Sequence, residues 1–454
     1  MTVAEKAASG LESRLITSVQ VRASIDRFLA WLERAGGESY DPYDLWGTRY
    51  GLLARRLYYA KNPLGLPLIA PIVAVETLVP SARGLFVRKQ RFATADAQLL
   101  LGFLNLCIVE RGAEASSPKP DRQPEPRKRS DSGAASGFLA SARKLAEELL
   151  QSSIPGYSGY CWGYPFDWQN NRGLWRRNTP FITSTPYCYE AFARLADLTG
   201  EARYLAVAES AARFVFQDLN DTPVGPGAAA ASYGPFDQTY VINASAYRAF
   251  VLFDAADRFG AAEYEDKAQA NLKFILDSQR SDGSWLYALN SPAEGFIDHF
   301  HTCFVLKNLF KINERLHSDR VEQALRHGDA YYRRELFDAE GHPKSFAIQP
   351  RTQLVRLEMY NFAESITLGS LMHEDSPVAF AEAQRLAALL IGSYQLPEGH
   401  FTTRVFMGGW RHTVPFIRWP QSQLFYALTN LLIALLGRDD HAISPDGADA
   451  TYGH

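Results

Sequence analysis

The chain has few cysteines for its length, and their positions exclude two common small-domain frameworks. Its 454 residues contain only Cys107, Cys161, Cys188 and Cys303. No two of them have the spacing of a zinc knuckle or of a disulfide scaffold. This usage favours a reducing compartment, so we expect a cytoplasmic protein.

The chain also has neither a strong excess of basic or acidic residues nor an extended apolar segment. The 47 basic and 50 acidic residues give a formal net charge of −3, whereas nucleic-acid binding needs a clear basic surplus. No run of about 18 apolar residues predicts a transmembrane helix. The first residues, Met1 to Lys6, do not have the basic-then-apolar pattern of a signal peptide.

A repeat of about 60 residues is the main positive feature. The starts of apolar helical patterns fall at Thr183, Asn243, His299, Tyr360 and Arg418, spaced by 60, 56, 61 and 58 residues. After each start come a polar turn and a second helical pattern. Such units cannot bury their apolar faces alone, so they stack. The repeat predicts pairs of antiparallel helices.

Six such pairs can be counted, which predicts an all-α (α/α)6 toroid with long rim loops. The expected pairs cover 94–152, 183–218, 243–278, 299–337, 360–394, and a last one formed by 418–437 with the N-terminal helix of 14–35. Proline, serine and charge dominate 111–135, which we predict to be a disordered insertion. The predicted division is 1–110 for N-terminal helices that close and start the ring, 136–440 for the toroid, and 441–454 for a disordered tail.

The connections between pairs are long and should emerge at one end of the ring. Aromatic residues make up 13% of the chain, with 22 Tyr, 27 Phe and 8 Trp. They are dense in 157–169, where Trp162 and Trp168 flank Asp167. Aromatic rings of this kind stack on the C–H faces of sugars, although they also serve as core. A second Pro-Phe-Asp triplet ends at Asp237, which could equally cap the following helix.

The strongest acid/base cluster lies at the start of the fourth unit. Asp298, His299 and His301 occur within four residues, and an aspartate beside histidines can hold one imidazole in a chosen tautomer. The alternative is that Asp298 is only a helix N-cap. A metal is not expected, because no second ligand group has metal spacing.

The later rim loops add further polar groups. Glu358 and Tyr360 open the fifth unit, and Arg404, Trp410 and His412 precede the last inner helix. Paired carboxylates are typical of glycoside hydrolysis. A tyrosine or histidine beside an arginine is suited to proton abstraction next to a sugar carboxylate, which leads to epimerisation or elimination. The sequence leaves both open.

One short motif resembles that of another toroid. The segment 279–285, Gln-Arg-Ser-Asp-Gly-Ser-Trp, is similar to the repeat motif of triterpene cyclases, but the acidic motif that protonates a polyprene is absent. We interpret 279–285 as a structural turn. An enzyme of the terpene cyclase or prenyltransferase type, acting on an isoprenoid or lipid-linked substrate, remains an alternative.

As a whole the chain resembles the six-hairpin α/α toroids, which include six-hairpin glycosidases, sugar 2-epimerases, glycan lyases and prenyltransferase-like toroids. Residues 160–169 followed by Asn178-Thr179-Pro180 are similar to toroid proteins encoded with bacterial capsule and exopolysaccharide enzymes. The resemblance implies a carbohydrate-active protein of surface polysaccharide biosynthesis, with a glycan or sugar substrate, no cofactor and assembly proteins as partners. A non-catalytic glycan-binding scaffold is the other alternative. The predicted catalytic residues are Asp298, His299, Glu358 and Tyr360, and the predicted substrate-binding residues are Trp162, Asp167, Trp168, Asp237, His301, Arg404, Trp410 and His412.

Overall fold

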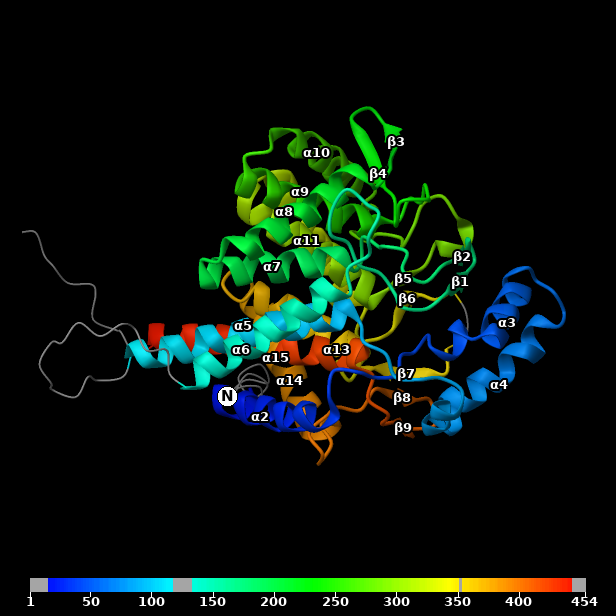
Figure 1. Cartoon of the computed structure of the whole chain (residues 1–454), viewed down its shortest axis with the longest axis horizontal. Helices are drawn as coiled ribbons and strands as arrows, with labels where there is room; N and C mark the ends of the chain where they lie inside the picture. The colour runs from blue at the N-terminus through cyan, green and yellow to red at the C-terminus, as the bar shows by residue number, and fades with distance from the viewer. Residues whose placement is uncertain (1–14, 117–132, 351–352, 443–454) are drawn as a thin grey trace, which may run out of the picture.

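A computed structural model describes residues 15–116, 133–350 and 353–442. Six helical hairpins form a closed ring, and the predicted (α/α)6 toroid is confirmed. Figure 1 shows the ring from the side, with most of its helices running across the picture. The inner helices are α5 (Ala93–Ser116), α7 (Thr185–Thr199), α9 (Ile242–Phe259), α11 (His299–Leu316), α13 (Met359–Leu371) and α15 (Ser422–Ala442). Their outer partners are α6 (Gly133–Gln151), α8 (Ala202–Gln217), α10 (Ala262–Asp277), α12 (Asp319–Glu335), α14 (Pro377–Tyr394) and, for α15, α2 (Ser18–Ala35).

Local sequence explains where the hairpins turn. Helix α7 ends at Gly200 and α9 ends at Gly260, both with positive φ (70° and 67°) in the left-handed conformation that glycine adopts without strain. The next helix starts two residues later in each case. These short turns keep the two helices of a unit antiparallel and in contact.

Burial separates the inner helices from the outer ones. Helix α9 is buried over most of its surface, whereas α10 buries mainly a stripe that includes Tyr264, Ala268, Leu272 and Ile275. This is the pattern of a helix covered on all sides next to one that faces solvent on one side. Helix α5 contains a stretch, Ala93–Ala113, that is long and apolar enough to cross a membrane, but 72% of its apolar window is buried in the ring.

The ring closes between its first and last units. Helix α15 packs against both α5 and α2, and the Asn105 side chain donates to Thr429 Oγ1 at 3.1 Å. Ser24 of α2 donates to Gln395 Oε1, just after α14, at 2.8 Å. The predicted pairing of 418–437 with the N-terminal helix is therefore present.

Short strands and turns gather at the end of the ring where the inner helices begin (Figure 1). The two-stranded units are β1–β2 (Trp168–Asn170, Gly173–Trp175), β3–β4 (Asp221–Gly225, Ala228–Ala231) and β5–β6 (Ile297–Asp298, Phe346–Ile348). A three-stranded sheet joins β7 (Val355–Glu358), β8 (Arg404–Phe406) and β9 (Arg411–His412). The 3-10 helices η1 (Leu45–Gly47), η2 (Pro80–Leu85) and η3 (Pro292–Glu294) and the irregular turn η4 (Ile417–Gln421) complete this rim.

The N-terminal third contains one element that the sequence reading missed. Residues 62–71 have the proline and glycine content of a bend, but α4 (Gly65–Leu78) continues through Pro71 and pairs with α3 (Arg49–Tyr59). Helix α5 ends at Ser116 and α6 begins at Gly133, so both helices reach into the predicted insertion 111–135. Residues 117–132 of that insertion lie outside the described residues. Most of the predicted tail 441–454 also lies outside them.

Candidate active site

The ring encloses a cavity of about 460 Å³ that opens at the strand-bearing rim. Inner helices and rim loops all contribute to it. Its polar and charged lining residues are Tyr43, Tyr58, Tyr59, Thr94, Tyr164, Asn170, Asn171, Arg172, Thr183, Tyr187, Tyr233, Thr239, Tyr247, Tyr287, Glu294, Asp298, His301, Tyr360, Arg418 and Gln423, with Trp168, Trp175 and Trp419 among the rings. A cavity of this size is in the range of small-molecule sites, about 300–1,000 Å³.

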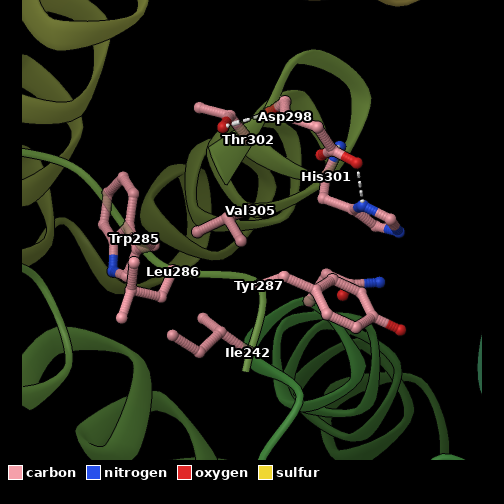
Figure 2. A pocket seen from close by; sticks show the side chains of 9 residues that line it. Ile242, Trp285, Leu286, Tyr287, Asp298, His301, Thr302 and Val305 are labelled. Atoms are coloured by element: carbon pink, nitrogen blue, oxygen red, sulfur yellow. Dashed lines mark hydrogen bonds and ion pairs between the residues drawn. The ribbon is translucent and has the colours of Figure 1, made fainter. Parts of the chain in front are cut away.

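An aspartate and a histidine form a dyad in the cavity wall. Asp298 is the N-cap of α11, and its Oδ1 accepts the backbone N–H of His301 at 3.1 Å. Its Oδ2 lies 2.7 Å from Nδ1 of the same histidine (Figure 2). A carboxylate in this position favours the tautomer with the proton on Nδ1. The other ring nitrogen, Nε2, then has a free lone pair at a side chain that lines the cavity.

A buried arginine forms a second charged part of the wall. Arg418 Nη2 donates to Asp41 Oδ1 at 2.8 Å, and both side chains are almost fully buried. The guanidinium lies 4.9 Å from the ring centroid of Tyr164 and 5.6 Å from that of Tyr43. Burial lowers the pKa of Arg418, but Asp41 more than offsets this and raises it overall. The group is a permanent cation held by one carboxylate and aromatic faces.

Glu294 and Arg172 link two rim loops at the cavity mouth. Arg172, in the β1–β2 turn, donates through Nε to both Glu294 carboxylate oxygens at 3.0 Å. Asn171 adds a hydrogen bond to Glu294 Oε1 at 2.8 Å. This carboxylate is therefore fully engaged by neighbouring donors.

Protonated phenols and stacked rings make up most of the remaining wall. Burial raises the pKa of Tyr164, Tyr233 and Tyr360 above the ordinary tyrosine value, so these phenols stay neutral near pH 7. Tyr360 and Trp419 stack with ring centroids 3.8 Å apart and planes 10° apart. Neutral phenols beside flat rings can donate to hydroxyl groups and support the apolar face of a sugar.

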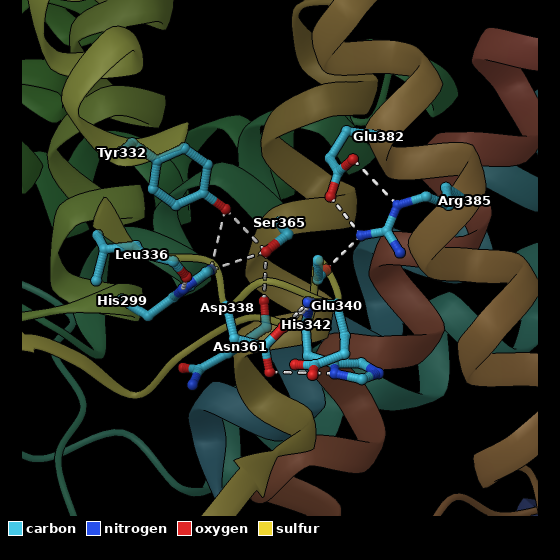
Figure 3. Close-up of polar contacts among 11 residues, drawn as sticks. His299, Tyr332, Leu336, Asp338, Glu340, His342, Asn361, Ser365, Glu382 and Arg385 are labelled. Atoms are coloured by element: carbon cyan, nitrogen blue, oxygen red, sulfur yellow. Dashed lines mark hydrogen bonds and ion pairs between the residues drawn. The ribbon is translucent and has the colours of Figure 1, made fainter. Parts of the chain in front are cut away.

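Four of the residues predicted from the sequence line this cavity: Asp298, His301, Tyr360 and Trp168. His299 does not. Its Nδ1 lies 3.2 Å from the Leu336 carbonyl oxygen, and its Nε2 lies 2.8 Å from Ser365 Oγ (Figure 3). Burial lowers its pKa to about 3. In this position His299 is a structural residue between α11, α12 and α13.

Glu358, Arg404 and His412 form a separate buried cluster beside the cavity. Glu358 Oε2 accepts from Arg404 Nε at 2.6 Å, across the β7–β8 pair. The ring nitrogens of His412 are buried without hydrogen-bond partners. Burial, and after it the charges of Arg404 and Arg83, lower the pKa of His412 to about 3. These three residues connect rim strands and are outside the cavity lining.

The other predicted binding residues also lie away from the cavity wall. Trp162 is buried, and its indole N–H donates to the Leu149 carbonyl at 2.8 Å. Asp167 accepts the backbone N–H of Arg177 at 2.7 Å, and Asp237 accepts that of Gly234 at 2.6 Å, so both carboxylates hold turns. Trp410 is 45% exposed on the outer rim.

Asp41 and most of the cavity tyrosines were not among the residues predicted from the sequence. Asp41 lies in an N-terminal turn, 377 positions before the arginine that it binds. The sequence gives little indication that Asp41 binds an arginine, because the Asp41-Pro42-Tyr43-Asp44 segment has the composition of an ordinary turn. The nine tyrosines of the lining come from eight different helices and loops, and only the fold brings them together.

One group of possible metal ligands occurs in the part of the chain that the structure describes. Ligand atoms of Asp338, Glu340 and His342 lie within 4.8 Å of one another, in the loop after α12 (Figure 3). Asp338 already accepts backbone N–H groups of Glu340 and His342 at 3.1 and 2.7 Å. This loop is not part of the cavity lining, and the dyad does not belong to it.

A scan against protein-family models and a search of curated proteins find no match. Solved structures do match. A GH76 α-mannanase of Bacteroides thetaiotaomicron has a TM-score of 0.53 at 11% identity, over 77% of this chain and 88% of that one. A cellobiose 2-epimerase of Bacillus thermoamylovorans has a TM-score of 0.55 at 9% identity, over 76% of this chain and 87% of that one. A D-mannose isomerase has a TM-score of 0.54 at 12% identity, over 77% of this chain and 87% of that one.

Identities this low show the fold alone. The mannanase, the epimerase and the isomerase share one ring architecture with the protein described above. By its fold, the chain is an (α/α)6 toroid like these three structures.

Proposed function

We propose that the protein is a sugar isomerase or epimerase that moves a proton next to the carbonyl carbon of a reducing sugar. The observation that carries this proposal is the Asp298–His301 dyad, whose imidazole Nε2 belongs to the cavity wall. An imidazole oriented by a carboxylate is a general base suited to neutral pH.

The carboxylates of the cavity favour this reaction over glycoside hydrolysis. Only Asp298 and Glu294 are acidic among the described lining residues. Asp298 is bonded to His301, and Glu294 is bonded to Arg172 and Asn171. Glycoside hydrolysis uses one protonated carboxyl and one free carboxylate on opposite sides of the scissile bond. Neither engaged group is available for such a pair.

The number of imidazoles favours isomerisation over epimerisation. In an aldose–ketose isomerisation, His301 Nε2 takes the proton from C2 of the open-chain sugar, and the C1 carbonyl becomes an enediolate. The same imidazolium then returns the proton to C1 on the same face, while a proton moves from the C2 hydroxyl to the C1 oxygen. Epimerisation needs a second acid on the other face. His301 is the only histidine among the described lining residues.

The rest of the wall supports a sugar substrate. Trp168, Trp419 and the protonated phenols offer stacking faces and hydroxyl partners. Arg418 belongs to the same wall, and Asp41 balances its charge. The matched structures include a D-mannose isomerase, a cellobiose 2-epimerase and a GH76 α-mannanase. The similarity of residues 160–169 to capsule-cluster toroids supports a cytoplasmic role in surface polysaccharide synthesis.

A substrate screen tests the reaction. The protein is incubated with mannose, glucose, fructose, N-acetylmannosamine and glucuronate in D2O, and the products are separated and examined by NMR. We expect conversion between an aldose and its ketose, and loss of that conversion in His301→Gln. His327→Gln, on the exposed side of α12, is the matched control and should retain full activity. No aldose–ketose conversion of any of these sugars, or full conversion by the His301→Gln variant, would refute the proposal.

A further inference from the structure

Helix α4 has an apolar face that the ring does not cover. From Gly65 to Val75 its sequence contains no polar side chain. Nevertheless Leu66, Pro67, Ala70, Pro71 and Ala74 are exposed, and only Gly65, Ile72 and Glu76 of α4 are buried. A helix that is apolar all round is normally enclosed by protein or lies in lipid.

In this helix the charged side chain points into the protein, whereas large apolar side chains face the solvent. Its one carboxylate, Glu76, faces the protein and binds Arg83. Leu66 is 68% exposed and Leu78 is 70% exposed. The helix is also well anchored, since Tyr50 of α3 donates to the Leu68 carbonyl at 2.8 Å. The apolar face is therefore a fixed surface rather than a loose segment.

Neighbouring elements extend this surface. The β8–β9 turn joins α4 through Trp410, whose indole N–H donates to the Thr77 carbonyl at 3.1 Å. We call α3, α4, η2 and this turn the apolar lobe, which projects from the ring in Figure 1. Its exposed large hydrophobic residues are Tyr50, Leu53, Leu64, Leu66, Leu78, Val79, Leu85, Phe86, Met407 and Trp410, half of all those exposed in the described residues.

The charge of the apolar lobe has one sign. Residues 45–91 contain eight Lys or Arg and one acidic residue, the buried Glu76, whereas the whole chain has a net charge of −3. Arg49, Arg56, Lys61, Arg88 and Lys89 are exposed. An apolar face bordered by basic side chains is the pattern of elements that bind anionic lipid surfaces.

We propose that the apolar lobe docks on an anionic lipid bilayer. Helix α4 has 14 residues, fewer than the roughly 20 needed to span the hydrocarbon core, so it lies in the interfacial layer. Exposed apolar side chains enter that layer, and the lysines and arginines contact the headgroups. Tyr58 and Tyr59 of α3 line the central cavity. Docking therefore brings the cavity mouth close to the membrane surface.

Vesicle flotation tests the proposal with the full chain and without sugar, so its outcome is independent of the reaction in the cavity. Neutral phosphatidylcholine vesicles are compared with vesicles that also contain phosphatidylglycerol. We expect binding to the anionic vesicles that weakens as salt is raised. The variant Leu66→Gln/Leu78→Gln should bind about tenfold or more weakly. Arg56→Gln/Lys61→Gln should lose binding mainly at low salt.

Val19→Gln/Val378→Gln is the matched control, because these valines are 75% and 68% exposed on outer helices α2 and α14. It should bind like the wild type. Thermal unfolding verifies that each variant is folded. Two results overturn the proposal: no binding of the wild type to anionic vesicles, or equal binding of the Leu66→Gln/Leu78→Gln variant. A wild-type dimer by light scattering that this variant converts to a monomer would also overturn it, by assigning the lobe to a second copy of the chain.

Discussion

Replacing Asp298 by Asn tests the dyad with little disturbance of the fold. Asparagine is as good an N-cap as aspartate, so its side-chain oxygen can still accept the His301 backbone N–H. We therefore expect the free energy of unfolding to change by less than about 1 kcal/mol. The contact at Nδ1 changes in kind, because an amide N–H placed there stabilises the tautomer with the proton on Nε2. That tautomer has no lone pair for the substrate.

The loss can be bounded from the geometry. A charge-assisted hydrogen bond such as the 2.7 Å contact is worth about 1.5–3 kcal/mol, or about 10- to 150-fold in rate. A wrong tautomer in a comparable hydrolase dyad costs about 10⁴-fold. We expect kcat to fall by about 10- to 10⁴-fold, while KM changes little.

Initial rates with the sugar found in the screen measure this loss, and NMR of ¹⁵N-labelled imidazoles reports the tautomer without any substrate. Asp282→Asn is the matched control. Asp282 also accepts the backbone N–H of a following residue, Ser284, but in a turn outside the cavity lining. Full kcat in the Asp298→Asn variant, or an unchanged His301 tautomer, would refute the role assigned to this carboxylate.

Two further predictions concern buried charge. Arg418→Met leaves Asp41 buried and unpaired, so urea unfolding should show a loss of about 3–5 kcal/mol, most of it recovered in Arg418→Met/Asp41→Leu; equal losses in both variants would contradict this. The folded-state pKa of His412, about 3, lies below the ordinary histidine value of 6.5, so the wild type loses stability as the pH falls below 6.5. His412→Gln lacks this titration, so its free energy of unfolding minus that of the wild type should be about 2 kcal/mol larger at pH 5 than at pH 8. The same difference at both pH values would show that His412 is not buried in neutral form.

The helical ring could be predicted because its signals are local. Apolar periodicity and the glycines after α7 and α9 mark each hairpin within one repeat. Helix α4 escaped this reasoning because Pro67 and Pro71 are typical of a bend and its exposed face has no polar residues. The usual link between exposure and polarity fails there.

The site could be predicted only in part. The dyad was found because Asp298 and His301 are local partners at one helix start. His299 was misplaced because residues two apart on a helix point in nearly opposite directions, so only one of the two histidines can face the cavity. Glu358 was expected at the mouth from its repeat position, but Arg404 engages it across a strand pair that the sequence does not reveal.

The closure of the ring has a consequence for how the protein is made. Helix α2 cannot form its native packing until α15 has been synthesised, because the two helices form one hairpin unit and nearly the whole chain lies between them. Until the ribosome has released α15, the sides of α2 and α5 that it covers have no native partner. Such long-range closure is slow and leaves hydrophobic surface exposed during synthesis. We therefore expect the nascent chain to depend on chaperones until α15 is in place.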